Sequence, residues 1–528
     1  MERDSGKDSK REEKLGPGGV AGALSLLAAL VERGLRTVIL CPGGRNAPML
    51  QALELVASPW KLEVHTFFDE RAAGFFALGR AKRDEAPVLV SVTSGTAVAE
   101  LLPAAIEAHA GDTPLVIVSA DRPRSHRGSG SPQSMRQVNL FGDYAPTLHD
   151  WQEGEELPEW LSTWTLRSPV HVNLCHDEPL WDKSAQIPEK VPTQKLQKKS
   201  YGTITASFPN FKKPLVLVGA LAPSERDAVA TFCRWYRAPV LAEASSGIRE
   251  VNMPSQVLAA DRIVRRWFKA QEFDGVIRFG ATPSWRLWRD LENWQGPVVS
   301  FGQTQWPGLP GRTLSSGDLA PWLQRWMKEG PKVELRAEFH QEDHLIAQKR
   351  EALLERYPMS EAALVRKVSV HAPPHALMYL GNSRPVRDWN EHALQSKAFE
   401  IQENRGLNGI DGQASSFYGH ARPHQENWAL MGDLTLMYDM QAMWALRLLD
   451  PDTHTRLVVL NNSGGQIFKR MFPSPLFLNS HQQSFEHLAH FWNMPYSREL
   501  TVEARHALIE LIPAAEETEA FKDAWDKL

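Results

Sequence analysis

Residues 428–434 read Trp-Ala-Leu-Met-Gly-Asp-Leu, and residues 456–465 read Arg-Leu-Val-Val-Leu-Asn-Asn-Ser-Gly-Gly. Each stretch is an apolar strand candidate that ends in polar residues and glycine. The 26 residues of 435–460 leave room for one crossover helix between the two polar ends. Two parallel strands joined in this way would bring Asp433 and Asn462 together at the carboxyl edge of one sheet, where open α/β sheets bind ligands.

These polar residues predict a site for Mg²⁺ or Mn²⁺. A carboxylate from Asp433, an amide oxygen from Asn462 and the backbone carbonyl of Gly464 are hard oxygen ligands, which suit Mg²⁺ and leave coordination positions for phosphate oxygens. The neighbouring glycines allow the backbone to approach a phosphate closely. A turn aspartate followed by a surface Asn-Gly loop would give the same residues, so the motif by itself leaves both interpretations open.

Apolar strand candidates alternate with helical segments along the chain and divide it into three α/β units. The candidates are 37–41, 87–92 and 114–119 in the first unit, 214–219, 275–280 and 297–302 in the second, and 376–380, 428–431 and 456–460 in the third. Continuous apolar strands between helices are typical of parallel sheets that are covered on both faces. The sequence therefore predicts an α/β protein with three doubly wound parallel-sheet domains.

Composition suggests the boundaries of these domains. Residues 1–16 are mostly charged and are expected to be a disordered tail. Residues 183–210 are polar and rich in lysine, with prolines at Pro188 and Pro192, and are expected to be a linker. The expected domains are 17–182, 211–330 and 361–528, with a charged helical connector at 331–360.

The overall composition excludes several classes of protein. The chain has 59 Lys and Arg against 63 Asp and Glu, a net charge of −4, so a broad nucleic-acid-binding surface is not expected. Cys41, Cys175 and Cys233 are widely separated and form no zinc set, which indicates a reduced, cytoplasmic setting. No apolar stretch reaches the roughly 20 residues of a membrane span, and the N-terminus has no apolar core of a signal peptide.

Several motifs resemble those of thiamine diphosphate enzymes. Residues 69–79, an acidic helix start, and 93–97, Thr-Ser-Gly-Thr-Ala, resemble their pyrimidine-binding domain, and the Asp433 and Asn462 motifs resemble their diphosphate-binding motif. Two more segments, 381–388 and 404–412, are similar to one family, the 2-succinyl-5-enolpyruvyl-6-hydroxy-3-cyclohexene-1-carboxylate synthases, known as MenD. Further matches at 120–123, 133–137 and 461–468 extend the resemblance over nearly all of 20–500, more loosely in the central unit.

The resemblance implies a thiamine diphosphate-dependent enzyme of menaquinone synthesis. Members of this family join 2-oxoglutarate to isochorismate with loss of CO2, which requires deprotonation of the thiazolium C2. Glu70 would be the catalytic residue, because its carboxyl would hydrogen-bond the pyrimidine N1′ and favour the imino tautomer that acts as base. By itself, Glu70 would be an ordinary acidic residue near a helix N-terminus.

The resemblance also implies contacts to the cofactor from the third unit. Ile410 would support the bent cofactor, Ser383 would contact cofactor or substrate, and Asp433 and Leu434 would lie at the diphosphate. A core isoleucine and a helix-capping serine are the alternative interpretations of the first two residues.

Substrates with several carboxylates need cationic partners, and arginine offers a permanent charge with planar donors. The candidates in strand-end motifs are Arg45, Arg122, Arg387 and Arg405, joined by Gln133 for the isochorismate-like substrate and by Arg286, near which the family often has lysine. A surface ion pair is the alternative for any single arginine. The resemblance implies a homodimer or a dimer of dimers, with active sites between the first unit of one subunit and the third unit of another.

Two positions depart from the family pattern. The loop 41–46, Cys-Pro-Gly-Gly-Arg-Asn, replaces a serine-rich loop, so Gly44 lacks a hydroxyl, and Glu100 stands where asparagine is common. These changes leave open a cofactor-binding paralogue without turnover. Another thiamine-dependent 2-oxo acid decarboxylase or carboligase would explain Glu70 and Asp433 equally well, but not the set of arginines or the segment 404–412.

Overall fold

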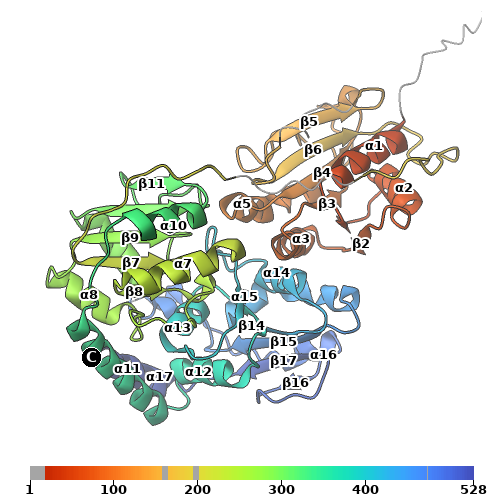
Figure 1. Ribbon diagram of the computed structural model, residues 1–528. Coiled ribbons are helices and arrows are strands. Elements are labelled where there is room, and N and C mark those ends of the chain that lie inside the picture. Colours follow the sequence, from red (N-terminus) through yellow and green to blue (C-terminus); the bar gives the residue numbers. More distant parts are fainter. Residues whose placement is uncertain (1–17, 157–163, 194–200, 473) are drawn as a thin grey trace, which may run out of the picture. The chain divides into compact units, whose positions relative to one another are not determined.

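The computed structural model describes residues 18–156, 164–193, 201–472 and 474–528 (Figure 1). The expected tail at 1–16 therefore lies outside the described residues. The chain forms two compact units, unit 1 (residues 1–198) and unit 2 (residues 199–528). The described residues form three sheets, one in unit 1 and two in unit 2, and all the strand pairs recorded in them are parallel. The predicted α/β class with three parallel sheets is confirmed.

Unit 1 contains a six-stranded sheet in the order β2-β1-β3-β4-β6-β5. Its strands are β1 (Thr37–Leu40), β2 (Glu63–Thr66), β3 (Val88–Val92), β4 (Leu115–Asp121), β5 (Thr147–Gln152) and β6 (Val170–Cys175). Its helices are α1 (Gly19–Glu32), α2 (Ala47–Val56), α3 (Glu70–Asp84), α4 (Thr96–Ala99) and α5 (Leu102–Ala110).

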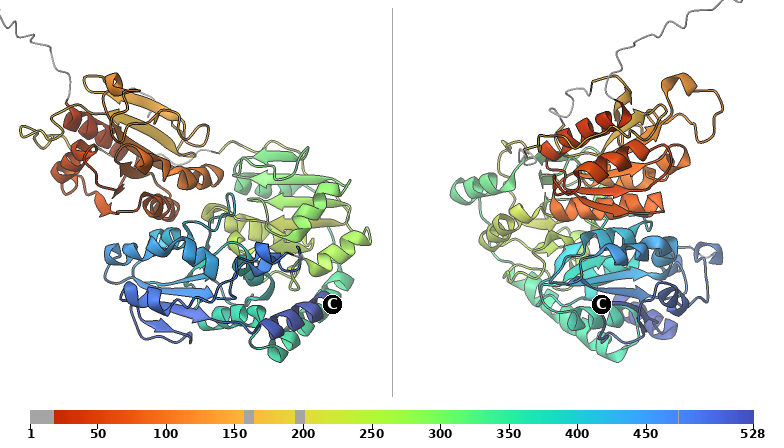
Figure 2. Two further views of the ribbon diagram at one scale, coloured as in Figure 1. Left: turned by 180° about the vertical axis from the view of Figure 1, so that it is seen from behind. Right: turned by 90° about the vertical axis from the view of Figure 1, so that its right-hand side faces the viewer.

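The two faces of this sheet pack against two different layers of helices. Val38, Leu89 and Val116 lie side by side in register and pack with α1 and α2 in one apolar core. Helices α3 and α5 contact each other and contribute nothing to that core, since they cover the opposite face (Figure 2). The carboxyl edge of the sheet stays open for the loops that follow β1, β3 and β4, as expected for a doubly wound sheet.

Unit 2 begins with a five-stranded sheet in the order β11-β10-β9-β7-β8. Its strands are β7 (Pro214–Val218), β8 (Val240–Ala242), β9 (Gly275–Phe279), β10 (Val298–Gly302) and β11 (Thr313–Ser316). Its helices are α7 (Pro223–Tyr236), α8 (Asp261–Lys269), α9 (Arg286–Asp290) and α10 (Leu319–Glu329), followed by the long helix α11 (Ala337–Arg356).

The second sheet of unit 2 has six strands in the order β13-β12-β14-β15-β17-β16. Its strands are β12 (Leu377–Leu380), β13 (Glu400–Gln402), β14 (Glu426–Gly432), β15 (His454–Leu460), β16 (Tyr496–Ser497) and β17 (His506–Leu511). Its helices are α12 (Glu361–His371), α13 (Arg384–His392), α14 (Gln413–His420), α15 (Asp433–Tyr438), α16 (Glu486–Phe491) and α17 (Ala515–Asp526).

The strand pair predicted from residues 428–465 is present. Strands β14 and β15 are parallel neighbours, and Gly432 lies opposite Leu460 at their carboxyl ends. The crossover between them is a short helix, α15, followed by a 3₁₀ segment at Met440–Leu448, and not one continuous α-helix. Asp433 and Asn462 therefore come from adjacent strand ends.

A buried arginine joins the two sheets of unit 2. Arg249, which is 1% exposed, follows β8 and donates to the carbonyls of Ala393 (2.9 Å) and Leu394 (3.1 Å) just beyond α13. Asn390 on α13 accepts a hydrogen bond from the Ala244 amide at 2.8 Å. The segment that follows β8 therefore holds α13 at its C-terminal end. None of the helices in the described part of the chain is long and apolar enough to span a membrane.

Candidate active site

The residues predicted from the sequence to form the site fall into two groups, one in each unit. Most of them lie in segments that follow the carboxyl ends of strands. Unit 1 holds Arg45, Glu70, Arg122 and Gln133, and unit 2 holds Arg286, Ser383, Arg387, Arg405, Ile410, Asp433, Leu434, Asn462 and Gly464.

Glu70 is held in the first turn of α3 by a helix cap. The Asp69 carboxylate accepts a hydrogen bond from the Ala72 amide at 2.8 Å, which starts the helix and leaves the Glu70 side chain half-buried. Burial raises the pKa of the Glu70 carboxyl, its own backbone amide lowers it, and the nearby carboxylates of Asp69 and Glu100 raise it again. Glu70 is therefore biased toward the protonated form, in which it can donate a hydrogen bond.

The two departures from the family pattern have different structural consequences. A Cβ on Gly44 would meet nothing within 4 Å, so packing does not require glycine at this position. Glu100, in contrast, is close enough to Glu70 to influence the protonation of its carboxyl. Of the two changes, Glu100 is the one that acts on the predicted catalytic residue.

The glycine of the 93–97 loop is held by a buried glutamine. Gly95 has φ +82° and donates its amide hydrogen to Oε1 of Gln137 at 3.0 Å. The Gln137 amide group donates to the Ala120 carbonyl at 3.0 Å and to Asn173 Oδ1 at 2.8 Å. Gln137 thus connects the segments that follow β3 and β4, which carry three of the predicted motifs.

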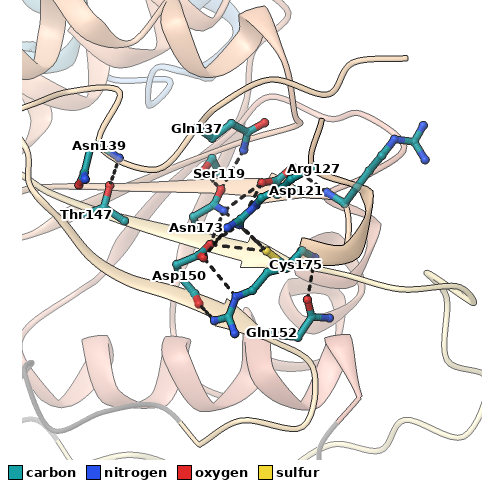
Figure 3. A network of polar contacts seen from close by, with 12 residues as sticks. Ser119, Asp121, Arg127, Gln137, Asn139, Thr147, Asp150, Gln152, Asn173 and Cys175 are labelled. Atoms are coloured by element: carbon teal, nitrogen blue, oxygen red, sulfur yellow. Dashed lines mark hydrogen bonds and ion pairs between the residues drawn. The ribbon is translucent and has the colours of Figure 1, made fainter. Parts of the chain in front are cut away.

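Figure 3 shows the polar network that continues from Gln137. Asn173 donates to Asp150 at 2.8 Å and to Asp121 at 3.1 Å, and Arg127 donates to Asp150 at 2.6 Å. Hydrogen bonds from Arg127 and Asn173 outweigh the effect of burial and lower the pKa of Asp150 to about 2. A network of charged, hydrogen-bonded side chains therefore supports the loop at the end of β4.

The remaining unit 1 candidates are tied to this loop or to β6. Arg122 donates through Nε and Nη2 to the Pro132 carbonyl, both at 3.2 Å, next to Gln133. Arg45 donates to the His176 carbonyl at 3.3 Å and lies 3.4 Å from Glu178. The structure thus brings Arg122 and Gln133 together and holds Arg45 near the end of β6.

Replacing Gln137 by alanine should destabilise unit 1. The change removes three buried hydrogen bonds, including the one from the Gly95 N–H, so the free energy of unfolding should fall by about 2 kcal/mol or more. Denaturant unfolding, together with hydrogen exchange of the Gly95 amide, measures this effect. The exposed Gln186→Ala in the same unit is the control and should change stability by less than about 0.5 kcal/mol. Unchanged stability and exchange in Gln137→Ala would contradict this role.

Asp433 lies at the centre of the second group. It is 3% exposed, its Oδ1 accepts from the Leu434 amide at 2.6 Å, and its Oδ2 accepts from the Gly464 amide at 2.9 Å. His481 Nε2 lies 3.2 Å from the same Oδ2. Burial nevertheless raises the pKa of the Asp433 carboxyl, because these contacts only partly offset desolvation. A bound cation would compensate this buried carboxylate.

Asn462 and Gly464 fit a cation site beside Asp433. The Asn462 amide nitrogen donates to Glu361 at 2.8 Å, whereas its buried Oδ1 accepts no hydrogen bond from the described residues. Gly464 has φ +131°, and a Cβ there would collide with the Leu478 carbonyl, so only glycine is tolerated. No group of three or more His, Cys, Asp or Glu suited to a metal occurs among the described residues. A cation here would therefore combine the Asp433 carboxylate with amide and carbonyl oxygens, which suits Mg²⁺.

One residue that the sequence analysis did not single out joins the two most family-specific segments. Asn382 is fully buried, and its side chain donates to the carbonyls of Asn404 (2.6 Å) and Gly409 (2.7 Å). Its Oδ1 accepts a hydrogen bond from Arg405 at 3.0 Å. Segments 381–388 and 404–412 therefore form a single hydrogen-bonded structure.

Ser383 and Ile410 lie in these two hydrogen-bonded segments. Ser383 is the N-cap residue of α13 with φ +72°, but its side chain makes no capping hydrogen bond in the structure. Ile410 is half-buried and not fully enclosed in a core. The Ser383 side chain therefore does not cap the helix, and Ile410 is not a fully buried core residue.

Arg405 lies close enough to Arg387 to lower the pKa of its guanidinium. Burial lowers the pKa of Arg387, and the positive charge of Arg405 lowers it further. The carboxyl of Glu243 is buried beside both arginines. Burial raises the pKa of this carboxyl, and the positive charges of Arg405 and Arg387 lower it. Glu243 follows β8 directly and accepts a hydrogen bond from the Ser284 amide at 2.5 Å. Its position at a strand end was the only sequence signal for this residue.

Arg286 differs from the other arginines. Its side chain is 59% exposed and forms an ion pair with Asp290 at 2.9 Å, one turn along α9. Ser284, two residues earlier, contacts Glu243, so the segment before Arg286 does reach the group around Arg387 and Arg405.

The chain is similar to a known protein family and to named relatives. The family model described as "Thiamine pyrophosphate enzyme, N-terminal TPP binding domain" matches residues 21–140. A relative from Bdellovibrio bacteriovorus is 37% identical and covers 96% of this chain and 98% of its own. A relative from Akkermansia muciniphila is also 37% identical, with 94% of this chain and 97% of its own covered. Both are named 2-succinyl-5-enolpyruvyl-6-hydroxy-3-cyclohexene-1-carboxylate synthase.

The fold is shared with a solved structure described as a thiamin diphosphate-dependent enzyme from Mycobacterium smegmatis. The TM-score is 0.68 at 15% identity, and the match covers 94% of this chain and 99% of that chain. The resemblance carried by the sequence motifs is confirmed by the two relatives. The chain therefore belongs to the 2-succinyl-5-enolpyruvyl-6-hydroxy-3-cyclohexene-1-carboxylate synthases, a family of thiamine diphosphate-dependent enzymes that form carbon–carbon bonds.

Proposed function

We propose that the protein decarboxylates 2-oxoglutarate and adds the resulting four-carbon unit to isochorismate, which gives 2-succinyl-5-enolpyruvyl-6-hydroxy-3-cyclohexene-1-carboxylate and CO2 in menaquinone biosynthesis. The observation that carries this proposal is the 37% identity to synthases of this name along 96% of the chain. The two groups of polar residues at strand ends supply the chemistry that this reaction needs.

The third sheet would hold the cation and the diphosphate. Asp433, the Asn462 amide oxygen and the Gly464 carbonyl would bind Mg²⁺, or Mn²⁺ with the same ligands, and Leu434 would lie beside the diphosphate. The buried, unpartnered Asn462 oxygen and the desolvated Asp433 carboxylate support this assignment. Bound thiamine diphosphate supplies a carbon nucleophile and an electron sink for decarboxylation. Ser383 and Ile410 would position its reactive part.

Glu70 would donate a hydrogen bond to the pyrimidine ring of the cofactor. Burial raises the pKa of its carboxyl, which favours a carboxylic acid able to donate to the N1′ nitrogen. Glu70 would thereby hold a proton at N1′, where the chemistry of the bound cofactor needs one. Asp69 fixes the position of Glu70 through the helix cap, and its carboxylate adds to the raised pKa of Glu70.

The arginines would bind the carboxylates of the substrates. Arg387 and Arg405 repel each other in a half-buried setting, and Glu243 offsets only part of this cost. A substrate carboxylate would offset more of it through paired hydrogen bonds. Arg45, Arg122 and Gln133 would contribute from unit 1, and Arg286 would contribute only by leaving its exposed ion pair with Asp290.

We further propose a homodimer or homotetramer in which unit 1 of one subunit and unit 2 of another complete each active site. This division would explain why Glu70 and Asp433 lie in separate compact units. The three cysteines, Cys41, Cys175 and Cys233, are free and buried, which supports a reducing, cytoplasmic setting.

The proposal is tested by an omission assay. Purified protein receives thiamine diphosphate, Mg²⁺, 2-oxoglutarate and isochorismate, and each component is left out in turn while mass spectrometry follows the adduct. Adduct that depends on all four components is the expected result. Succinic semialdehyde or an acyloin formed without consumption of isochorismate would favour another decarboxylase or carboligase. Absence of any product from protein that binds the cofactor would favour a paralogue without turnover and implicate Glu100.

A further inference from the structure

We propose that Glu361 is a positioning residue that orients the Asn462 carboxamide so that its oxygen faces the divalent cation. The inference rests on the proposed cation site at Asp433 and Asn462. Glu361 begins α12, far from the strand-end motifs in sequence, and the established similarity to the synthase family does not assign it a role. Its contact with Asn462 spans 101 positions of the chain.

The geometry of this contact determines which way the carboxamide points. Oε1 of Glu361 accepts a hydrogen bond from Nδ2 of Asn462 at 2.8 Å. A carboxylate can only accept hydrogen bonds, so the amide nitrogen must face Glu361 and the oxygen must face away from it. That oxygen is buried and has no hydrogen-bond partner among the described residues. An unpartnered buried acceptor is costly, and a cation at this point would remove the cost.

Without Glu361, the carboxamide would lose this preference. The two ends of an amide have nearly the same shape, so a half-turn would direct two N–H donors at the cation with little change in packing. A cation would then meet partial positive charge where it needs an oxygen ligand. Glu361 would therefore contribute to cation affinity without touching the cation.

Glu361 is itself held firmly in the structure. It is 3% exposed, and its backbone amide donates to the Thr518 hydroxyl at 3.1 Å. Its second carboxylate oxygen lies 3.6 Å from both Arg384 Nε and Lys522 Nζ. These two cations compensate the buried charge, which is the condition for keeping an ionised acceptor in a protein interior.

The experiment is a double-mutant cycle on cation affinity in the full-length protein. Isothermal titration calorimetry measures Mg²⁺ binding at saturating thiamine diphosphate for the unchanged protein, Glu361→Gln, Asn462→Ala and the double variant. Glu361→Gln should weaken Mg²⁺ binding by about 10- to 100-fold, the usual effect of losing a group that orients a metal ligand, because glutamine can turn its NH2 group toward Asn462 and no longer fixes which end of that carboxamide faces the cation. In the Asn462→Ala background the same substitution should change the affinity by less than about twofold, because no carboxamide is left to orient.

A neighbouring pair provides the matched control. Glu510 is also a fully buried carboxylate that accepts from an asparagine, Asn461 Nδ2 at 2.6 Å, but Asn461 is not a proposed ligand. Glu510→Gln should leave Mg²⁺ affinity within about twofold. Glu361→Asp replaces Glu361→Gln where the latter does not fold: it keeps the charge beside Arg384 and Lys522, withdraws the acceptor from Asn462 and should weaken Mg²⁺ binding.

The outcomes separate this inference from the proposed function. Equal weakening by Glu361→Gln in both backgrounds would overturn the role through Asn462, and so would equal weakening by Glu510→Gln. Unchanged affinity in both Glu361 variants, with weakened binding in Asn462→Ala and Asp433→Ala, would overturn the inference but leave the cation site in place. Unchanged affinity in Asn462→Ala and Asp433→Ala would remove the cation site, and the inference with it.

Discussion

Replacing Glu70 by glutamine is expected to lower kcat by about 10²- to 10⁴-fold, the range that positioned acid–base groups contribute. Glutamine keeps the size and position of the side chain at the start of α3 but has no proton to exchange with the pyrimidine N1′. The residues proposed to bind the substrates are others, so KM should change little. Initial rates of CO2 release at saturating cofactor, with isochorismate present, measure both parameters.

The exposed Glu54→Gln, on α2 of the same unit, is the control for this substitution and should leave the rate unchanged. Glu100→Asn should lower the pKa of Glu70, because the Glu100 carboxylate contributes to raising it. Turnover by Glu70→Gln at the rate of the unchanged protein would show that Glu70 does not control the proton, whatever the cofactor affinity.

Replacing Asp433 by alanine is expected to weaken Mg²⁺-dependent binding of thiamine diphosphate by at least about 100-fold. Asp433 is the only charged ligand proposed, so its loss should exceed the usual effect of losing an orienting neighbour. The Gly464 amide and His481 would also lose their acceptor at the same point. Calorimetric titration of the cofactor at fixed Mg²⁺ gives the affinity.

The control for Asp433→Ala is Asp452→Ala, which removes an exposed carboxylate from the loop before β15. Its ion pair with His424, at 3.7 Å, has both side chains more than half exposed and should contribute little. Cofactor affinity that is equal in Asp433→Ala and the unchanged protein would place the cation elsewhere.

The central strand pair could be predicted from the sequence because its signals are local. Residues 428–431 and 457–460 are continuous apolar runs, and the observed strands end at Gly432 and Leu460, where Asp433 and Asn461 follow. Edge strands lacked such a signal. Strand β5 (Thr147–Gln152) is mixed in character and only half-buried, and β16 (Tyr496–Ser497) is two residues long, so pairing with their neighbours determines both.

In the candidate site, too, residues in local motifs could be predicted and long-range contacts could not. Glu70, Asp433 and Asn462 stand in short motifs next to strand ends and could be predicted, although their roles remain predictions. The groups that hold the site act over long sequence distances: Gln137 accepts from Gly95 across 42 positions, and Glu361 accepts from Asn462 across 101. No local pattern of residues encodes such a contact, because it depends on how the strands and helices pack.

The proposed reaction sends the carbon atoms of 2-oxoglutarate to two different products. The most direct measurement incubates the protein, thiamine diphosphate, Mg²⁺ and isochorismate with 2-oxoglutarate labelled with ¹³C either at C1 or at the other four carbons. The C1 label should appear only in CO2, the other label should appear in the isochorismate adduct, and the two products should form in equal amounts. Labelled CO2 with labelled semialdehyde and unchanged isochorismate would contradict it.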